Sequence, residues 1–224
     1  MIEKQIILDT ETTGLDIRDG HRIVEIGCLE IENFIPTKKT FHCYLNPERK
    51  VSEQAFKVHG YSDEFLSSQK KFSDIAEEFL KFIEGKKLVI HNAKFDISHL
   101  NNELMLANKK KIDFEKVIDT LEIAKSKFPG AQISLDALCK RYKIDNSKRT
   151  KHTAIIDCEL LSKVYVNLLD QKEPILNFGS FDKSQISDTK ISHSYCKKVI
   201  KPTQEEIKLH KDFLKSSLKK NFFN

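Results

Sequence analysis

The chain has 224 residues, of which 39% are hydrophobic and 32% are charged, and this is enough for one domain with a single core plus an appendage. The formal net charge of +5 is compatible with a polyanionic partner but does not demand one, because runs of charge are usually solvated. No apolar run approaches a membrane-spanning length, no signal peptide is evident, and the five cysteines lack the spacing of a zinc or redox site, so we expect a cytoplasmic protein without membrane contact.

The first part of the chain predicts paired strands. Residues 6–9 form a buried strand candidate, and Gly14 and the polar residues 16–20 indicate a loop. Residues 23–32 and 41–45 are further strand candidates, because β-forming residues alternate in them with a period of two. The connections are short, and this favours antiparallel neighbours.

From residue 73 onward the pattern changes to helices that alternate with short strands. Ser73 is expected to cap a helix that Gly85 ends, and a short strand at 88–90 precedes a helix at 95–107. The later candidates are a strand at 117–119 and helices at 121–127, 134–142 and 154–169. Strands that first pair and then alternate with helices predict an α/β domain with a mixed sheet.

Composition divides the chain into three parts. Residues 1–170 form the predicted domain, and residues 171–200 read as a linker because they contain Pro, Gly and many Ser, Asp and Lys without periodicity. Residues 201–224 predict a helical tail, with Thr203 and Glu206 placed as a capping box. One amphipathic helix cannot form a core alone, so the tail is expected to pack on the domain or to dock in a partner's groove.

Two carboxylates, Asp9 and Glu11, follow the apolar run 6–8. Residues two apart in a strand point to the same face, so both acids would be directed at one place. Like charges this close repel unless a cation lies between them, and a hard divalent ion with oxygen ligands is the obvious candidate. Taken alone, an Asp-x-Glu pair is more often a solvated strand end.

Three further residues are candidates for the same site. Asp96 lies near a predicted helix start soon after the strand at 88–90, where ligand sites of α/β sheets are favoured. Asp157 lies on the last long helix, and His152 is expected in the preceding loop or first turn, from which it can reach what Asp157 holds. A helix N-terminus disfavours imidazolium, which keeps His152 available as a base. Each residue alone has a simpler explanation as a cap or surface group, and only their combination predicts a site.

That combination resembles the exonuclease motifs of the DEDD superfamily, in its histidine-containing branch. The motifs are Asp9-x-Glu11-Thr12-Thr13-Gly14, His91-Asn92-x-x-Phe95-Asp96 and His152-x4-Asp157. The intervening segments Val58-His59-Gly60, Phe128-Pro129-Gly130, 134–139 and 144–150 resemble the proofreading epsilon subunits of bacterial DNA polymerase III. The resemblance covers residues 6–169 and implies a ribonuclease H-like fold, a mixed sheet flanked by helices.

The resemblance implies two-metal hydrolysis of phosphodiesters at DNA 3′ ends, with two divalent metal ions, Mg²⁺ or Mn²⁺, as cofactors. Asp9 is then the expected bridging ligand, Glu11 and Asp157 would hold one ion, and Asp96 would assist the second. His152 would take a proton from the attacking water. Asp9, Glu11 and Asp157 are also expected to border the bound 3′ end.

The expected substrate contacts follow from the same resemblance. His59 and Asn92 match positions beside the terminal nucleotide, and Thr12 and Thr13 could offer N–H groups or hydroxyls to the 3′ terminus. Gln54 stands near a position where the family often has Glu, and its amide can still donate and accept hydrogen bonds.

Expected partners come from the loop before His152 and from the region beyond the domain. Lys148, Arg149 and Lys151 would either meet DNA phosphates or form a solvated basic loop. Residues 201–220 resemble the tail that binds the polymerase alpha subunit, and residues 171–178 are where a peptide for the sliding clamp would lie. A small accessory subunit stays an open possibility.

Two other functions remain open from the sequence. An RNA-directed 3′→5′ exoribonuclease of the same superfamily would share these motifs, because no residue decides whether a 2′-OH is tolerated. A noncatalytic scaffold between polymerase and clamp is the other, although a scaffold has no reason to gather four carboxylates around a histidine. The predicted linker and helical tail favour the proofreading subunit, because a free-standing ribonuclease has no evident need of them.

Overall fold

The computed structural model describes residues 3–147, 149, 151–170 and 202–217, with the side chains of 215–217 excepted. These residues belong to two compact units, one containing 3–170 and the other 202–217. The predicted linker at 171–200 lies outside the described residues, so the division at residue 170 stays a prediction. None of the helices in the described part has the length and apolar character needed to cross a bilayer.

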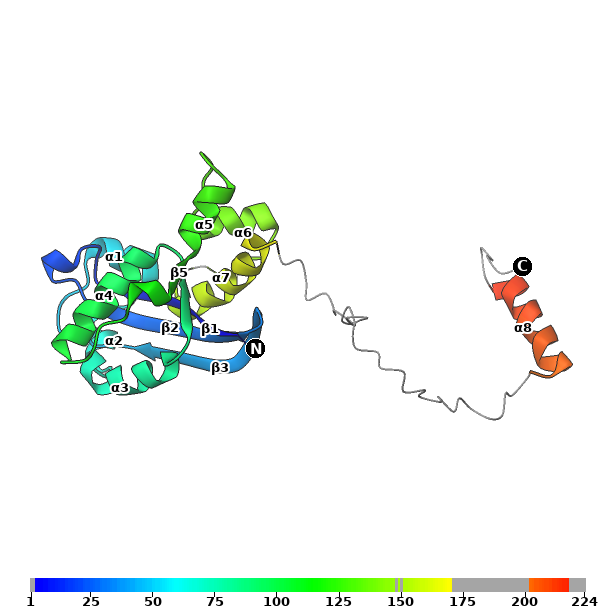
Figure 1. Ribbon diagram of the computed structural model, residues 1–224, viewed down its shortest axis with the longest axis horizontal. Helices are drawn as coiled ribbons and strands as arrows, with labels where there is room; N and C mark the ends of the chain where they lie inside the picture. Colours follow the sequence, from blue (N-terminus) through cyan, green and yellow to red (C-terminus); the bar gives the residue numbers. More distant parts are fainter. Residues whose placement is uncertain (1–2, 148, 150, 171–201, 218–224) are drawn as a thin grey trace, which may run out of the picture. The chain divides into compact units, whose positions relative to one another are not determined.

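A five-stranded sheet with the order β3-β2-β1-β4-β5 forms the centre of the first unit (Figure 1). Its strands are β1 Lys4–Thr12, β2 Ile23–Glu32, β3 Ile35–Tyr44, β4 Lys87–Ile90 and β5 Val117–Asp119. β1, β2 and β3 pair antiparallel, whereas β4 pairs parallel to β1 and β5 pairs parallel to β4. The predicted mixed sheet is confirmed, and β1 is longer than predicted because the strand continues through both acids.

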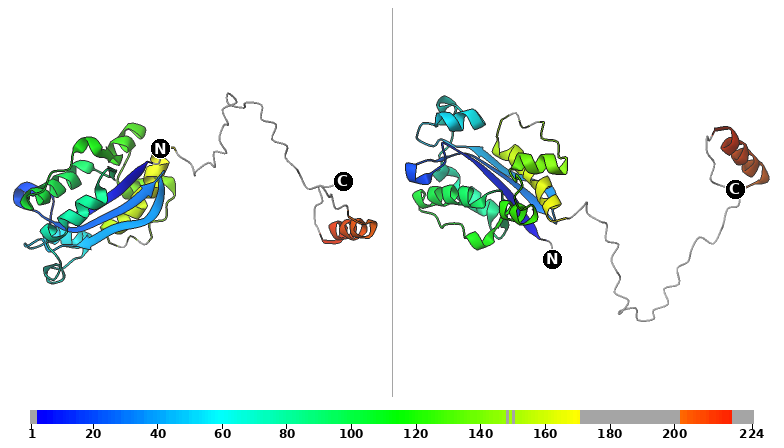
Figure 2. Two further views of the ribbon diagram at one scale, coloured as in Figure 1. Left: turned by 60° about the horizontal axis from the view of Figure 1, so that its bottom comes forward. Right: turned by 90° about the horizontal axis from the view of Figure 1, so that it is seen from above.

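Helices cover both faces of the sheet (Figure 2). α3 Phe72–Ile83 and α4 Ala93–Leu106 cover one face, and α5 Thr120–Lys127, α6 Leu135–Tyr142 and α7 Ala154–Leu168 cover the other. The remaining short elements are α1 Glu53–His59, α2 Asp63–Ser67 and the 3₁₀ turns η1 Ile17–Asp19 and η2 Phe114–Lys116. These short elements were not predicted, because a segment of so few residues is too short to display a helical periodicity.

The alternation of side chains along β1 decides which acids face which helices. Leu8 belongs to the core under α3 and α4, whereas Ile7 belongs to the core under α7. By the same alternation, Asp9 and Glu11 face the α7 layer and Thr10 faces α4.

α7 lies directly on β2 because Gly27 has no side chain. A Cβ at Gly27 would lie 2.5 Å from the carbonyl carbon of Ala154 and 2.7 Å from the amide nitrogen of Ile155. One turn further along the helix, the Cys158 thiol donates to the carbonyl of Gly27 at 3.2 Å. This close packing brings the first turn of α7 beside the end of β1.

The start of α3 differs from the prediction by two positions. The helix begins at Phe72 with Lys71 as its N-cap, so the prediction of Ser73 as the cap was wrong. The Asp74 carboxylate accepts the Lys71 N–H at 3.0 Å and thus satisfies the open end of the helix. Phe72, the first helical residue, is buried in the core.

The second unit is the helix α8, Gln204–Ser217. Its predicted capping box is confirmed, because Thr203 N–H donates to the Glu206 carboxylate at 2.7 Å and Glu206 N–H donates to Thr203 Oγ1 at 3.3 Å. Leu209 on this helix is 70% exposed.

Candidate active site

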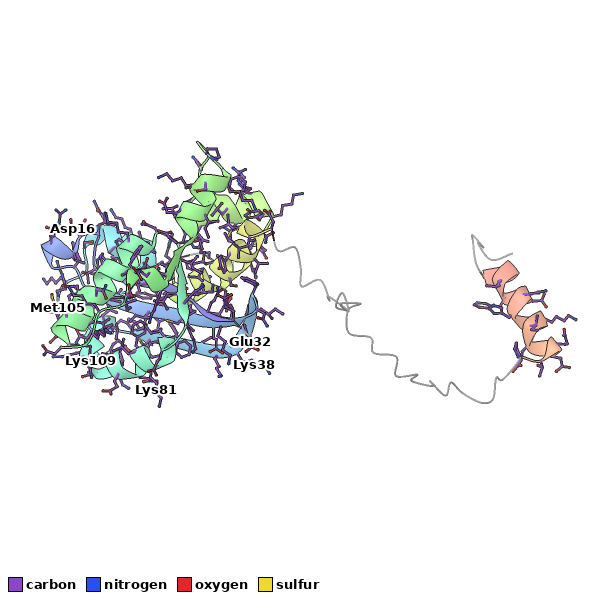
Figure 3. All side chains as sticks on the ribbon, in the orientation of Figure 1. Asp16, Glu32, Lys38, Lys81, Met105 and Lys109 are labelled. Carbon is purple, nitrogen blue, oxygen red and sulfur yellow. The ribbon has the colours of Figure 1, made fainter. Side chains whose placement is uncertain are left out.

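The candidate site lies at the end of the sheet toward which β1 runs. Asp16, in the loop that follows β1, lies at this end, and Glu32 and Lys38 of the β2–β3 hairpin lie at the opposite end (Figure 3). Because β4 is parallel to β1, the connection from β4 to α4 emerges at the same end as Asp9 and Glu11.

Asp96 reaches the end of β1 from the first turn of α4. Its Oδ1 accepts the Thr10 hydroxyl at 2.7 Å and the Thr10 N–H at 3.1 Å. Burial raises the pKa of Asp96 to about 7, although the hydrogen bonds from Thr10 act against this rise. Thr10 was not among the predicted site residues. The sequence does contain a signal for Thr10, because it lies between Asp9 and Glu11 and so faces the opposite side of the strand.

Asp9 and Glu11 share this end of the sheet with the other acids. Burial, followed by the charges of Asp96, Glu11 and Asp157, raises the pKa of Asp9 far above its usual range. Burial, followed by the charge of Asp157, raises the pKa of Glu11 to about 8. These carboxyl groups therefore cannot all ionise at neutral pH without added positive charge.

The start of α7 supplies the remaining two predicted residues. Asp157 is buried in its first turn, and His152 lies in the loop just before the helix, as predicted. The His152 N–H donates to the Val58 carbonyl at 3.3 Å, and its Nδ1 lies 3.4 Å from Oδ2 of Asp157. Single ligand atoms of Glu11, His152 and Asp157 all lie within 4.8 Å of one another.

Arg149 supplies a positive charge inside the site. Its Nε donates to Asp157 Oδ1 at 2.5 Å, and its Nη2 donates to Asp157 Oδ2 and to His152 Nδ1, both at 2.8 Å. Its Nη1 lies 2.6 Å from Oδ2 of Asp136. Burial acts to raise the pKa of Asp157, but its contacts with His152 and Arg149 outweigh burial and hold the pKa below its usual range.

The Arg149 contacts also define the state of His152. A guanidinium has only donors, so His152 Nδ1 accepts in this arrangement and carries no proton. The sequence offered Arg149 as a phosphate contact or as part of a solvated loop, whereas its side chain is only 7% exposed and its guanidinium lies among the acids. Sequence spacing could not reveal this, because the contact depends on how the loop folds back.

The donor set fits a hard divalent cation. Carboxylate oxygens are the ligands that Mg²⁺ and Mn²⁺ prefer. Burial, and for Asp9 and Glu11 also the neighbouring carboxylates, raises the pKa of three of the acids, and the Arg149 guanidinium already acts as a cation at Asp157.

A cavity of about 710 Å³ adjoins Glu11, whereas Asp9, Asp96 and Asp157 lie outside its lining. Among the residues predicted to touch substrate, Glu11, Thr12, Gln54 and His59 line this cavity. Phe95 of α4 also lines it and was not predicted as a contact, although it belongs to the motif that contains Asp96.

Thr13 and Asn92 lie outside the lining of this cavity. Thr13 is fully buried, and its hydroxyl accepts the Arg22 N–H at 3.1 Å. Asn92 is the N-cap of α4 with a φ of 69°, and its N–H donates to Asp119 at 3.1 Å. Both residues thus shape the ends of the elements that carry the acids.

His59 is neutral in this environment. Burial lowers the pKa of His59, and its Nδ1 accepts the Tyr61 N–H at 3.0 Å, so the ring proton is on Nε2. The His59 ring stacks on Tyr61 with 4.8 Å between ring centroids. His59 therefore presents a rigid ring at the cavity.

The sequence matches the family model of exonucleases over residues 6–165. A DNA polymerase III subunit epsilon of Rickettsia conorii is 48% identical over 225 residues, which cover 96% of this chain and 97% of that protein. The chain belongs to the DNA polymerase III epsilon family of exonucleases. The subunit of Escherichia coli K12 is also 48% identical, over 172 residues that cover 74% of this chain and 71% of that protein. The prediction of a metal-dependent 3′→5′ exonuclease is confirmed.

Solved structures confirm the ribonuclease H-like fold. The nuclease domain of 3′hExo, a DEDDh family member bound to rAMP, has a TM-score of 0.66 at 19% identity and covers 76% of this chain and 93% of that one. Exonuclease X in complex with 5′ overhanging duplex DNA has a TM-score of 0.58 at 23% identity and covers 75% of this chain and 92% of that one.

Proposed function

We propose that the chain removes nucleotides from DNA 3′ ends as the proofreading subunit of a replicative DNA polymerase. The observation that carries this proposal is the convergence of four acids and one histidine at a single end of the sheet, beside a cavity of about 710 Å³. The family membership described above supports the association with DNA polymerase III.

Asp9, Glu11, Asp96 and Asp157 would hold the two divalent ions, Mg²⁺ or Mn²⁺. When bound, the ions would stabilise negative charge on the attacking and leaving oxygens of the phosphodiester. Arg149 must turn away from Asp157 before that carboxylate can hold a cation. Its guanidinium is then free to meet a phosphate, for which its paired donors are well suited.

His152 would act as the general base. Its ring stands beside Asp157 with an unprotonated Nδ1, and its backbone is fixed to Val58. Its place just before α7 keeps the ring beside Asp157, where it can accept a proton from water.

The cavity would receive the terminal nucleotide. Thr12, Gln54 and His59 border it, and the His59 ring is held in place by Tyr61. Contacts of Thr13 and Asn92 with the substrate stay predictions, since both lie outside the cavity lining.

The helix α8 would bind the polymerase alpha subunit. It is capped at Thr203 and exposes Leu209, as expected of a helix that docks in an apolar groove. Contacts with the sliding clamp through residues 171–200, and with a small accessory subunit, stay predictions, since the structure does not describe those residues.

A primer–template with a mismatched 3′ end tests the proposed function. The full chain is expected to release mononucleotides from the 3′ end with Mg²⁺ or Mn²⁺, and to release none in a chelator. Asp9→Asn should lower the rate by at least about 10²-fold, whereas Glu53→Gln, a change at an exposed site on α1, should not. Metal-independent hydrolysis, or full activity of Asp9→Asn, would contradict the proposal. A matched RNA primer in the same assay separates it from an exoribonuclease.

A further inference from the structure

Glu25 is a carboxylate of β2 that lies outside the predicted set of acids. It pairs with Glu11 across the β1–β2 ladder, which places it on the face covered by α7. Its side chain is fully buried. Burying a carboxylate is costly unless hydrogen bonds and positive charge compensate it, so its partners must be strong.

Three donors from three different parts of the fold reach Glu25. His42 Nε2 of β3 lies 2.7 Å from Oε1. The Tyr61 hydroxyl at 2.8 Å and the Ala154 N–H at 3.0 Å both donate to Oε2. Ala154 is the first residue of α7, so the positive end of the helix dipole also faces the carboxylate.

The contact with Ala154 fixes the part of α7 that matters for the site. His152 lies two residues before Ala154 and Asp157 lies three residues after it. Gly27, two residues along β2 from Glu25, allows the backbone of Ala154 to touch the sheet. The first turn of α7 therefore packs on Gly27 and is held by the hydrogen bond from the Ala154 N–H to Glu25.

The contact with Tyr61 reaches the other side of the site. The Tyr61 ring stacks on His59, and its N–H donates to His59 Nδ1. The Tyr44 ring packs edge-on against the Tyr61 and His42 rings, with centroid distances of 5.1 and 5.0 Å. Tyr44 therefore holds both side chains that donate to Glu25 from this side.

We propose that Glu25 is a positioning residue that links two parts of the site, the residues proposed to act with the metal ions and His59 at the proposed nucleotide cavity. It holds the first turn of α7, with His152 and Asp157, and through Tyr61 it holds His59. This inference rests on the proposed function, because it assigns Glu25 a role only through residues that act there.

Three substitutions in the full chain separate this role from plain stability. Glu25→Ala removes both acceptor oxygens. Glu25→Gln can still accept from Tyr61 and Ala154 with its amide oxygen, and its amide nitrogen can donate to a neutral His42. Glu30→Ala is the matched control. Glu30 is also a buried glutamate of β2 and forms an ion pair with Lys86 at 3.0 Å. It lies opposite Ile6 of β1, further from the site than Gly27, which lies opposite Asp9.

Each variant is measured for its single-turnover rate at saturating primer, its KM, its Mn²⁺ dissociation constant by calorimetry and its Tm. Glu25→Ala is expected to lower the rate about 10²-fold and to weaken Mn²⁺ binding about tenfold, because the groups it positions are displaced. Glu25→Gln should restore both to within about threefold. Glu30→Ala should lower Tm and leave rate, KM and Mn²⁺ affinity near those of the unmodified chain.

Tyr61→Phe separates the two sides of the site. It removes the hydroxyl that joins His59 to Glu25 but keeps the ring, so KM should rise several-fold while the rate at saturation changes little. This variant also serves if Glu25→Ala does not fold.

The inference is overturned if Glu25→Ala matches Glu30→Ala in rate and Mn²⁺ affinity. It is also overturned if Glu25→Gln shows no rescue and falls about 10²-fold in rate, or if Tyr61→Phe keeps the original KM. A different result, in which the unmodified chain shows no metal-dependent hydrolysis at a 3′ end, would overturn the proposed function. The Mn²⁺ dissociation constants of the Glu25 variants would then still test the positioning role.

Discussion

Protons and cations compete for the same carboxyl groups in this site. The pKa values of Glu11 and Asp96 are raised to about 8 and about 7, whereas the pKa of Asp157 is lowered. The difference arises because Asp157 accepts two hydrogen bonds from the Arg149 guanidinium, whereas burial dominates at Glu11 and Asp96. Cation binding is therefore expected to release protons from Glu11 and Asp96, and metal affinity should rise with pH through neutrality.

Glu11→Gln should change how the stability of the metal-free protein depends on pH. The pKa of Glu11 rises from 4.5 to about 8 on folding, so between these values the folded state holds a proton that the unfolded state releases. The free energy of unfolding consequently falls as pH increases across this window. Glu11→Gln should remove much of that fall, measured by urea unfolding in a chelator, and Glu53→Gln should not. Parallel curves for Glu11→Gln and the unmodified chain would show that the Glu11 carboxyl is not held protonated.

His152→Ala should separate proton transfer from metal binding. The substitution removes the base but leaves all four acids, so we expect the single-turnover rate to fall about 10²-fold to 10⁴-fold while Mn²⁺ affinity changes little. His210→Ala on α8 is the control, because that histidine is exposed and lies on the other unit. An unchanged rate for His152→Ala would refute its role as the base.

Single residues also show where sequence reasoning stops. Asp9 and Glu11 could be paired from the sequence because their spacing along a strand predicts a shared direction. Asp96, His152 and Asp157 were predicted from their places near helix starts and from the resemblance to exonuclease motifs, and His152 does lie in the loop before α7. Arg149 and Glu25 could not be assigned to the site in this way. Glu25 meets Ala154 across 129 residues of chain through the packing of α7 on the sheet, whereas Arg149 meets Asp157 eight residues away because its loop folds back.

At the scale of elements, the site depends on two helix starts beside one strand end. Asp119 of β5 accepts the N–H groups of Asn92 and Ala93 at 3.1 and 3.0 Å, and Glu25 accepts that of Ala154. Each helix that contributes an acid is thus fastened at its first turn by a carboxylate from a neighbouring strand. Capping contacts of this kind each stabilise a helix start by about 1 kcal/mol.

Gly27→Ala should displace α7 from the sheet. The added methyl would lie within 2.7 Å of backbone atoms of Ala154 and Ile155, which cannot rotate away as a side chain can. We expect a loss of about 3 kcal/mol or more in the free energy of unfolding, together with a large loss of exonuclease rate. Gly130→Ala, where only the φ of 76° opposes a side chain, should cost about 1 kcal/mol and leave the rate intact. Equal effects of the two changes would contradict the close seating of α7.

The elements themselves were predictable in proportion to their length and alternation. β2 has the predicted bounds because apolar residues recur throughout its ten residues. α1 and α2 span seven and five residues, and each depends on a serine cap, Ser52 or Ser62, more than on an apolar stripe. The sequence pattern carries no period in such short segments, so α1, which positions His59, was missed.

At the scale of the whole molecule, the exonuclease machinery and α8 lie in separate units. The end of α7 is closed by Lys127, whose Nζ reaches the Leu168 carbonyl at 2.9 Å and the Asp170 carboxylate at 2.6 Å. All residues of the candidate site precede this point. Catalysis and attachment to the polymerase should therefore be separable by mutation.

Removal of the residues after 170 should leave an active exonuclease that no longer co-purifies with the polymerase alpha subunit. Leu209→Asp in the full chain is the sharper test, because it changes one exposed apolar residue of α8 and leaves residues 1–170 untouched. The measurements are hydrolysis of a mismatched primer and gel filtration with purified alpha subunit. Co-purification of the shortened chain would show that attachment is made elsewhere.

The thiol of Cys158, at the seam between α7 and β2, offers a way to time the opening of the site. The chain contains no Trp, so indole fluorescence cannot report on this region. Cys158 is fully buried, and an alkylating reagent can reach it only when α7 lifts from the sheet. Cys28 is buried in the core under α3 and α4. The labelling rates of Cys158 and Cys28, read by peptide mapping, therefore report separately on the opening of the two helical layers.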